Sequence, residues 1–181
     1  GLVPTLLRTM RLTGDVALPV AAARCLEALC KTNSVPLKEA VFAGEEHQVL
    51  VETLTAESTD LQRAVVSSVQ MLLTDSPHLV KKFRAAGGFL SLRMLLTAPL
   101  GPAPSTAPMY PVVLAGAQSL ASALAIPGNA DPPSVVEIAG YREEFIGNDG
   151  VGSLAALLTT GTPELTAVAV RLLCMLTSSE A

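Results

Sequence analysis

The sequence predicts an all-α protein in which helices stack as a solenoid, and two observations support that prediction. The first is a short sequence motif, a glycine turn followed by a leucine-rich run, which occurs four times, at residues 1–7, 44–54, 87–96 and 149–158. Each copy of the motif predicts an apolar helix joined by a polar turn to a second, longer apolar helix. A supersecondary unit that recurs along a chain is typical of stacked repeats, because neighbouring units bury one continuous core.

The second observation is the spacing between the copies of this motif. Val3 and Glu46 are 43 residues apart, as are Glu46 and Phe89, whereas Val151 follows Phe89 by 62 residues. Proline-rich stretches account for the longer interval. A period in the low forties with three helices per unit is typical of armadillo or HEAT repeats.

In the first half of the chain, apolar periodicity and turn residues predict helices at 2–12, 16–31, 34–43, 45–55, 60–74 and 76–85. Within the second of these, apolar residues recur at steps of three and four from Leu18 to Leu29, which gives the helix one buried face. Gly44 is expected in the left-handed conformation just past a helix end. Either Ser58 or Asp60 caps the helix at 60–74.

In the second half, helices are expected at 89–96, 111–126, 134–146, 151–160 and 164–177. The first two are separated by a proline-rich insertion, 97–111. A loop of this length inside a compact domain is either disordered or functional, and in the second case Met109 and Tyr110 would anchor a docked partner. We therefore expect one domain over 1–181, with repeats at approximately 1–33, 34–75, 76–126 and 134–178.

Composition narrows the class of protein. Half of the residues are hydrophobic and 15% are charged, so the chain can bury a large core. The apolar blocks are shorter than the roughly 18 residues that a membrane span needs, so no membrane insertion is expected. The net charge is −4, and no basic cluster exceeds 81–84, which argues against nucleic acid as a partner.

The cysteines and the first residue of the chain lead to two expectations, one about the cellular compartment and one about the size of the full protein. Cys25, Cys30 and Cys174 lie in apolar helical runs, so we expect small core side chains in a reducing compartment, the cytoplasm or the nucleus. The chain begins with Gly in mid-repeat, so we expect a fragment of a larger protein.

No chemistry is apparent in the polar residues. His47 and His78 lie in different repeats without a paired Ser or Cys motif, and the glycine-rich stretch 147–152 lacks both a lysine and a preceding strand. No Cys/His spacing typical of a metal site is present. We therefore expect a protein that is not an enzyme, with no catalytic, cofactor-binding or metal-binding residues.

Several of these segments resemble the armadillo repeat family. Residues 1–6 and 87–96 are similar to its second helix, which opens with glycines and a leucine-rich run, and residues 161–176 are similar to the turn and third helix. The resemblance covers essentially the whole chain. It implies a right-handed superhelical solenoid of about four three-helix repeats, whose third helices line a concave groove that binds an extended peptide or a helix of a partner protein.

One branch of that family, the nuclear-import adaptors, carries a Trp and an Asn on each third helix. The Trp positions correspond here to Arg24, Ser67, Gln118 and Arg171, and the Asn positions to Ala28, Met71, Ser122 and Met175. Neither Trp nor Asn occurs at any of them, which argues against binding of basic import signals.

Polar residues of the expected third helices are the candidates for partner contacts: Arg24, Glu27, Lys31, Arg63, Ser67, Gln70, Gln118, Ser122 and Arg171. Arginine is enriched at interaction hot spots, which favours binding. The alternative is that these residues form the solvated stripe of amphipathic helices.

The sequence thus predicts a protein–protein interaction scaffold or adaptor. Two alternatives remain open. The first is self-association, because the last helix carries more apolar residues than one neighbour can bury. The second is a regulatory domain of a larger multidomain protein.

Overall fold

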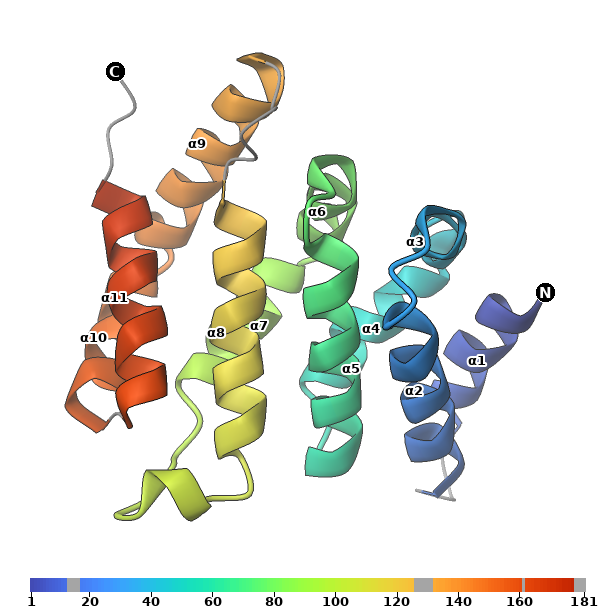
Figure 1. The fold of residues 1–181 in the computed structure, drawn as a ribbon, viewed down its shortest axis with the longest axis horizontal. Helices are drawn as coiled ribbons and strands as arrows, with labels where there is room; N and C mark the ends of the chain where they lie inside the picture. The colour runs from blue at the N-terminus through green and yellow to red at the C-terminus, as the bar shows by residue number, and fades with distance from the viewer. Residues whose placement is uncertain (13–16, 126–131, 161, 178–181) are drawn as a thin grey trace.

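The computed structural model describes residues 1–12, 17–125, 132–160 and 162–177, and within these ranges all regular structure is helical (Figure 1). The α-helices are α1 (Leu2–Met10), α2 (Ala17–Cys30), α3 (Val35–Val41), α4 (Gln48–Leu54), α5 (Thr59–Leu73), α6 (Pro77–Ala85), α7 (Gly88–Leu96), α8 (Tyr110–Leu124), α9 (Pro132–Gly147), α10 (Gly150–Thr160) and α11 (Pro163–Thr177). The described residues also form two short 3₁₀ turns, η1 (Glu45–His47) and η2 (Pro104–Thr106). The prediction of an all-α protein is confirmed.

The helices lie in three rows (Figure 1). In the front row, α2, α5, α8 and α11 stand side by side, each in contact with the next. The back row contains α1, α4, α7 and α10, and each of these helices packs against the front-row helix that follows it in the chain. The shorter helices α3 and α6, with α9, form the third row at one end of the front-row helices. The core lies mainly between the front and back rows, where Leu26, Val65 and Leu120 of the front row are fully buried.

The predicted helices lie within a few residues of those observed, and the two differ at some ends. Ser58 is the residue that caps α5, because its Oγ accepts a hydrogen bond from the Leu61 N–H at 3.4 Å. The prediction for Gly44 was wrong: its φ of −122° is extended backbone, and α3 ends two residues earlier at its C-cap, Phe42. The predicted helix start at residue 16 and the predicted end at 126 lie outside the described residues.

Buried cations cap the ends of two front-row helices. Lys38 of α3 donates from Nζ to the Thr74 carbonyl at 2.9 Å, at the C-terminus of α5. Arg142 of α9 donates from Nε and Nη2 to the Leu124 carbonyl, at 3.2 and 3.1 Å, at the C-terminus of α8. Both side chains belong to residues that are 8% exposed. Each cation therefore satisfies a terminal carbonyl and complements the negative end of the helix dipole.

A phenylalanine packs on a bare glycine where α7 and α10 begin. A Cβ added to Gly88 would lie 2.3 Å from the ring of Phe83, and one added to Gly150 would lie 2.3 Å from the ring of Phe145. In both cases the phenylalanine precedes the glycine by five residues. The close approach of ring and backbone therefore requires glycine at these two helix starts.

Two of the three cysteines are not core residues. Cys30 is buried, whereas Cys25 and Cys174 are exposed, and none of the three forms a disulfide. On α2 the buried stripe includes Ala22, Leu26 and Cys30, and Cys25 lies off that stripe. The prediction was wrong for Cys25 and Cys174 because their helices are apolar on several sides, and only tertiary packing selects the buried face.

The cysteines are expected to differ in reactivity. Burial raises the pKa of the Cys30 thiol to about 11, so at pH 8 only about one molecule in a thousand carries the thiolate that alkylating agents attack. We expect iodoacetamide to modify Cys25 and Cys174 in the folded protein and Cys30 only in denaturant, as measured by peptide mass spectrometry. Equal labelling of Cys30 with and without guanidinium would contradict this assignment.

Candidate functional site

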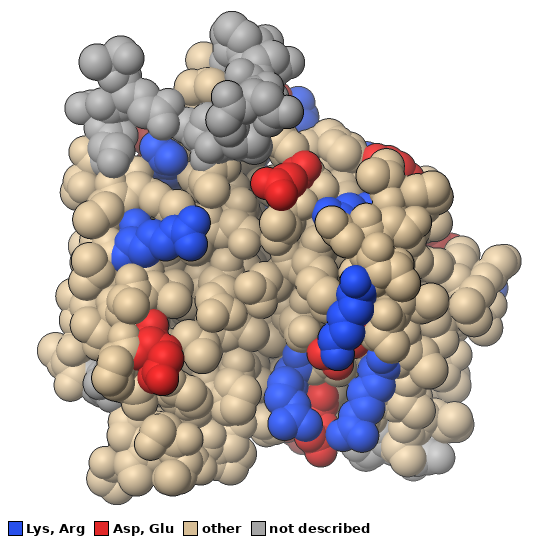
Figure 2. All heavy atoms as spheres, viewed as in Figure 1, with Lys and Arg blue, Asp and Glu red and all other residues tan. Residues whose placement is uncertain are grey.

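The candidate site is a groove on the front row, formed by α2, α5 and α8, with a volume of about 590 Å³. Its lining residues are Arg24, Glu27, Lys31, Asp60, Arg63, Ala64, Ser67, Gln70, Ala115 and Gln118. Seven of the nine residues that the sequence analysis singled out are in this set. Figure 2 shows basic and acidic atoms gathered over α2 and α5 on the face that carries the groove.

Helical periodicity explains why these side chains share one surface. Arg24 and Glu27 on α2 and Lys31 directly after its last residue follow one another at steps of three and four, and Arg63, Ser67 and Gln70 do so along α5. Because α2 and α5 are neighbours, the two stripes meet.

Two predicted residues do not line the groove. Ser122, half-buried, lies one turn beyond Gln118 on α8, and Arg171 is exposed on α11, which is separated from α5 by α8. Helix α8, which lies between α5 and α11, contains no charged residue. The charged residues of the front row therefore fall into two groups, one on α2 and α5 and the other on α11. Basic atoms are visible over α11 as well (Figure 2), and Arg171 is the basic residue of that helix.

Three lining residues, Asp60, Ala64 and Ala115, are not among the predicted partner contacts. Asp60 is predicted only as a possible helix cap, although its i,i+3 spacing to Arg63 places both on one face. Ala64 and Ala115 carry no polar group, so a search for polar residues could not find them. They leave room in the groove because they are small.

Ion pairs organise the charges of the groove. The Arg63 Nη2 lies 3.1 Å from the Asp60 Oδ1, and the Arg24 Nη2 lies 3.8 Å from the same oxygen. Glu27 is engaged twice, by the Lys31 Nζ at 3.5 Å and by the Ser67 hydroxyl, which donates to it at 3.0 Å. Three cations and two carboxylates leave the groove with a net positive charge, whereas the whole chain carries −4.

The groove also offers hydrogen-bonding capacity that the described part of the chain does not use. Gln70 and Gln118 are half-buried, and within the described ranges neither carboxamide has a hydrogen-bond partner. A carboxamide both donates and accepts, so each can pair with a backbone N–H or C=O of another chain. Small residues beside two unpaired carboxamides make this surface suited to a polypeptide segment.

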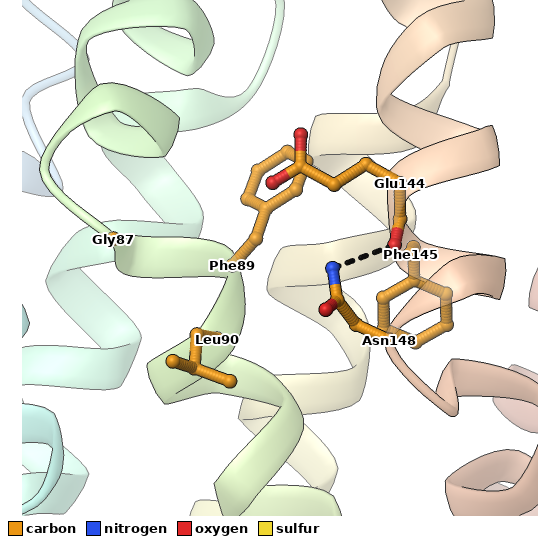
Figure 3. Close-up of a pocket in the computed structure, with 6 residues that line it drawn as sticks. All are labelled: Gly87, Phe89, Leu90, Glu144, Phe145 and Asn148. Carbon is orange, nitrogen blue, oxygen red and sulfur yellow. Dashed lines mark hydrogen bonds between the residues drawn. The ribbon is translucent and has the colours of Figure 1, made fainter.

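A second, smaller pocket of about 270 Å³ lies between the start of α7 and the end of α9, lined by Gly87, Phe89, Leu90, Glu144, Phe145 and Asn148 (Figure 3). Two of its polar groups are already engaged: the Asn148 Nδ2 donates to the Glu144 carbonyl at 2.8 Å, and the Glu144 carboxylate pairs with Arg84. It therefore offers less to a ligand than the groove does.

Both histidines, and the two residues expected to anchor a partner at the proline-rich insertion, form contacts within the chain. His47 bonds through Nδ1 to the Gly44 carbonyl, and His78 bonds through Nε2 to Glu39. Met109 accepts a hydrogen bond from Thr59, and the Tyr110 hydroxyl contacts Thr162 and Glu164.

Within the described residues, no group of three or more His, Cys, Asp or Glu side chains is arranged to hold a metal ion. In the same ranges, no helix has the length and apolar character needed to cross a bilayer.

Comparison with known proteins shows a shared fold and no family. No family model matches the chain, and no curated protein sequence matches it. Three crystal structures of engineered proteins from the Northeast Structural Genomics Consortium are similar to it, with TM-scores of 0.74, 0.77 and 0.74 and sequence identities of 22%, 22% and 18%. The matches cover 96%, 99% and 96% of this chain but 62%, 38% and 62% of those chains, so this chain spans less than two thirds of each.

Proposed function

We propose that the chain is an armadillo-like, right-handed superhelical solenoid of about four three-helix repeats that acts as a non-enzymatic scaffold for another protein. The order of the rows supports the first part, because successive helices go to the back row, the front row and the third row in turn. The sequence period and the similarity of nearly the whole chain to solved helical structures point the same way.

The groove between α2, α5 and α8 is the proposed binding site for a peptide or a helix of the partner. The observation that carries this proposal is the convergence of seven candidate residues on one groove that contains two unpaired carboxamides. Gln70 and Gln118 would hydrogen-bond the backbone of the bound segment, and the charged side chains would select its sequence. Ser122 and Arg171 would extend the site along α8 and α11.

Rigid elements make such a site efficient. Every groove residue except Lys31, which directly follows α2, lies on a helix that is packed on at least one neighbour, so binding orders little of the scaffold. As part of the same proposal, the protein functions in the cytoplasm or the nucleus, because none of its three cysteines forms a disulfide.

Removing the carboxamides tests the proposed site without changing its charge. We expect peptides selected from a random display library on the wild-type protein to bind Gln70→Ala/Gln118→Ala at least about tenfold more weakly, as measured by fluorescence anisotropy. The matched control is Arg8→Glu, an exposed substitution on the back-row helix α1, which should leave the affinity unchanged. Selected peptides that bind the double variant normally would place the site elsewhere.

Self-association is the second candidate function, favoured by apolar side chains on the last two helices. Val151 and Leu158 of α10 and Val170 of α11 are 42%, 37% and 46% exposed. A second copy could cover them, as neighbouring units do in a repeat array. A strict monomer at high concentration in sedimentation velocity would rule this candidate out.

A further inference from the structure

We infer that the groove takes an acidic segment of its partner, with one carboxylate bound between Arg24 and Arg63 in the place that Asp60 occupies in the free protein. This inference rests on the proposed function and adds the chemical class of the occupant. Its evidence is the distribution of charge within the groove.

The two arginines share a single carboxylate. Arg63 contacts Asp60 at 3.1 Å, within hydrogen-bonding distance, whereas Arg24 remains 3.8 Å away. A guanidinium has five N–H donors, so one carboxylate leaves most donors of this pair unused. The side chains of Arg24 and Arg63 are 59% and 53% exposed, so an incoming carboxylate can reach both.

The net positive charge of the groove resides on this pair of arginines. Lys31 and Glu27 compensate one another across α2, and Ser67 holds Glu27 further. Among the described residues, Arg24 and Arg63 form ion pairs with Asp60 alone. The residues that α8 contributes to the groove lining, Ala115 and Gln118, are uncharged and do not offset the excess.

The rest of the molecule favours the same choice of occupant. With a net charge of −4, the chain repels an acidic segment except where basic side chains gather, and the groove, with its net positive charge, is such a place. A basic segment would find two carboxylates that are already engaged, Asp60 by two arginines and Glu27 by Lys31 and Ser67. A nucleic acid needs a row of cations for successive phosphates, and here carboxylates alternate with the cations.

Fluorescence anisotropy with labelled peptides about a dozen residues long, long enough to span three helices, tests this inference. The probes alternate serine with glutamate, with lysine or with alanine, and a fourth probe is a single-stranded oligonucleotide matched in charge to the glutamate peptide. We expect the glutamate peptide to bind most tightly, and to bind more weakly as salt rises from about 50 to 300 mM.

Variants of the groove give changes of opposite sign. We expect Arg24→Glu/Arg63→Glu to weaken binding of the glutamate peptide at least about tenfold, and Asp60→Asn to strengthen it about two- to threefold, because the competing carboxylate is removed. A damaged fold would not raise the affinity, so the second result separates recognition from stability. Arg8→Glu on the back row should change nothing.

The inference is overturned if the lysine peptide or the oligonucleotide binds as tightly as the glutamate peptide, if the arginine reversals have no effect, or if no glutamate-peptide binding is seen up to about 1 mM. A neutral or basic peptide that binds and is lost in Gln70→Ala/Gln118→Ala would leave the proposed function standing and refute only the acidic occupant. Peptide binding that is unchanged in the arginine variant and in the glutamine variant would refute both the acidic occupant and the proposed function.

Discussion

Replacing Gly88 with valine is expected to destabilise the protein by about 2–3 kcal/mol. A Cβ at this position would lie 2.3 Å from the ring of Phe83, closer than any real contact of this kind. The ring cannot swing into solvent to make room, because Phe83 is fully buried. The start of α7 must therefore move away from α6, and packing between the back and front rows is lost. Urea unfolding followed by far-UV circular dichroism measures the change.

Other glycines of the chain supply the controls for this experiment. Gly140 lies exposed in α9 with open space around its Cα, so Gly140→Ala is expected to leave stability unchanged or raise it by up to about 1 kcal/mol. Gly150→Ala should destabilise, because its Cβ would meet the ring of Phe145. An unfolding midpoint of Gly88→Val equal to that of the wild type would show that the contact between ring and backbone is not required.

Substituting Arg142 with methionine is the second change for which we expect a large effect, a loss of about 2–3 kcal/mol. Methionine keeps much of the apolar stem but removes both donors to the Leu124 carbonyl. That carbonyl ends α8, where Arg142 also complements the helix dipole. The same denaturant titration measures the loss of stability. In hydrogen exchange, we expect α8 to lose more amide protection than any other helix.

Two variants test whether the donors of Arg142 are responsible. Arg142→Lys keeps the charge but offers a single ammonium in place of the planar fork, so its stability should lie between those of the wild type and Arg142→Met. Arg171→Met removes an exposed arginine from α11 and should change stability by less than about 0.5 kcal/mol. Equal effects of Arg142→Met and Arg171→Met would contradict the capping role.

Much of the fold could be predicted from the sequence because its local signals agree. Ser58 and Pro77 mark the starts of α5 and α6, and apolar steps of three and four define the helix faces. The errors lie where local signals are ambiguous. Gly44 leads into a 3₁₀ turn instead of ending a helix, and the surroundings of Cys25 and Cys174 are set by neighbouring helices.

The site was predictable to the extent that one helix determines it. Periodicity placed Arg24 with Lys31, and Arg63 with Gln70, on single faces. Which faces approach one another is a tertiary property, and α8 separates Arg171 from the groove for that reason. The contacts of Phe83 with Gly88 and of Phe145 with Gly150 were not foreseen, because a spacing of five residues is not a recognised helix signal.

The connection between α7 and α8, residues 97–109, lies at one end of the rows (Figure 1). Its attachments to the helices include the buried Leu100 and the hydrogen bond from Thr59 to Met109. Because lengthening a surface connection costs little closure entropy, residues can be added between these points without moving the helices. The length of the chain can therefore change at this position without a change in the surface that the helices form. The connection is thus a suitable place to insert a reporter or an affinity tag while the groove stays intact.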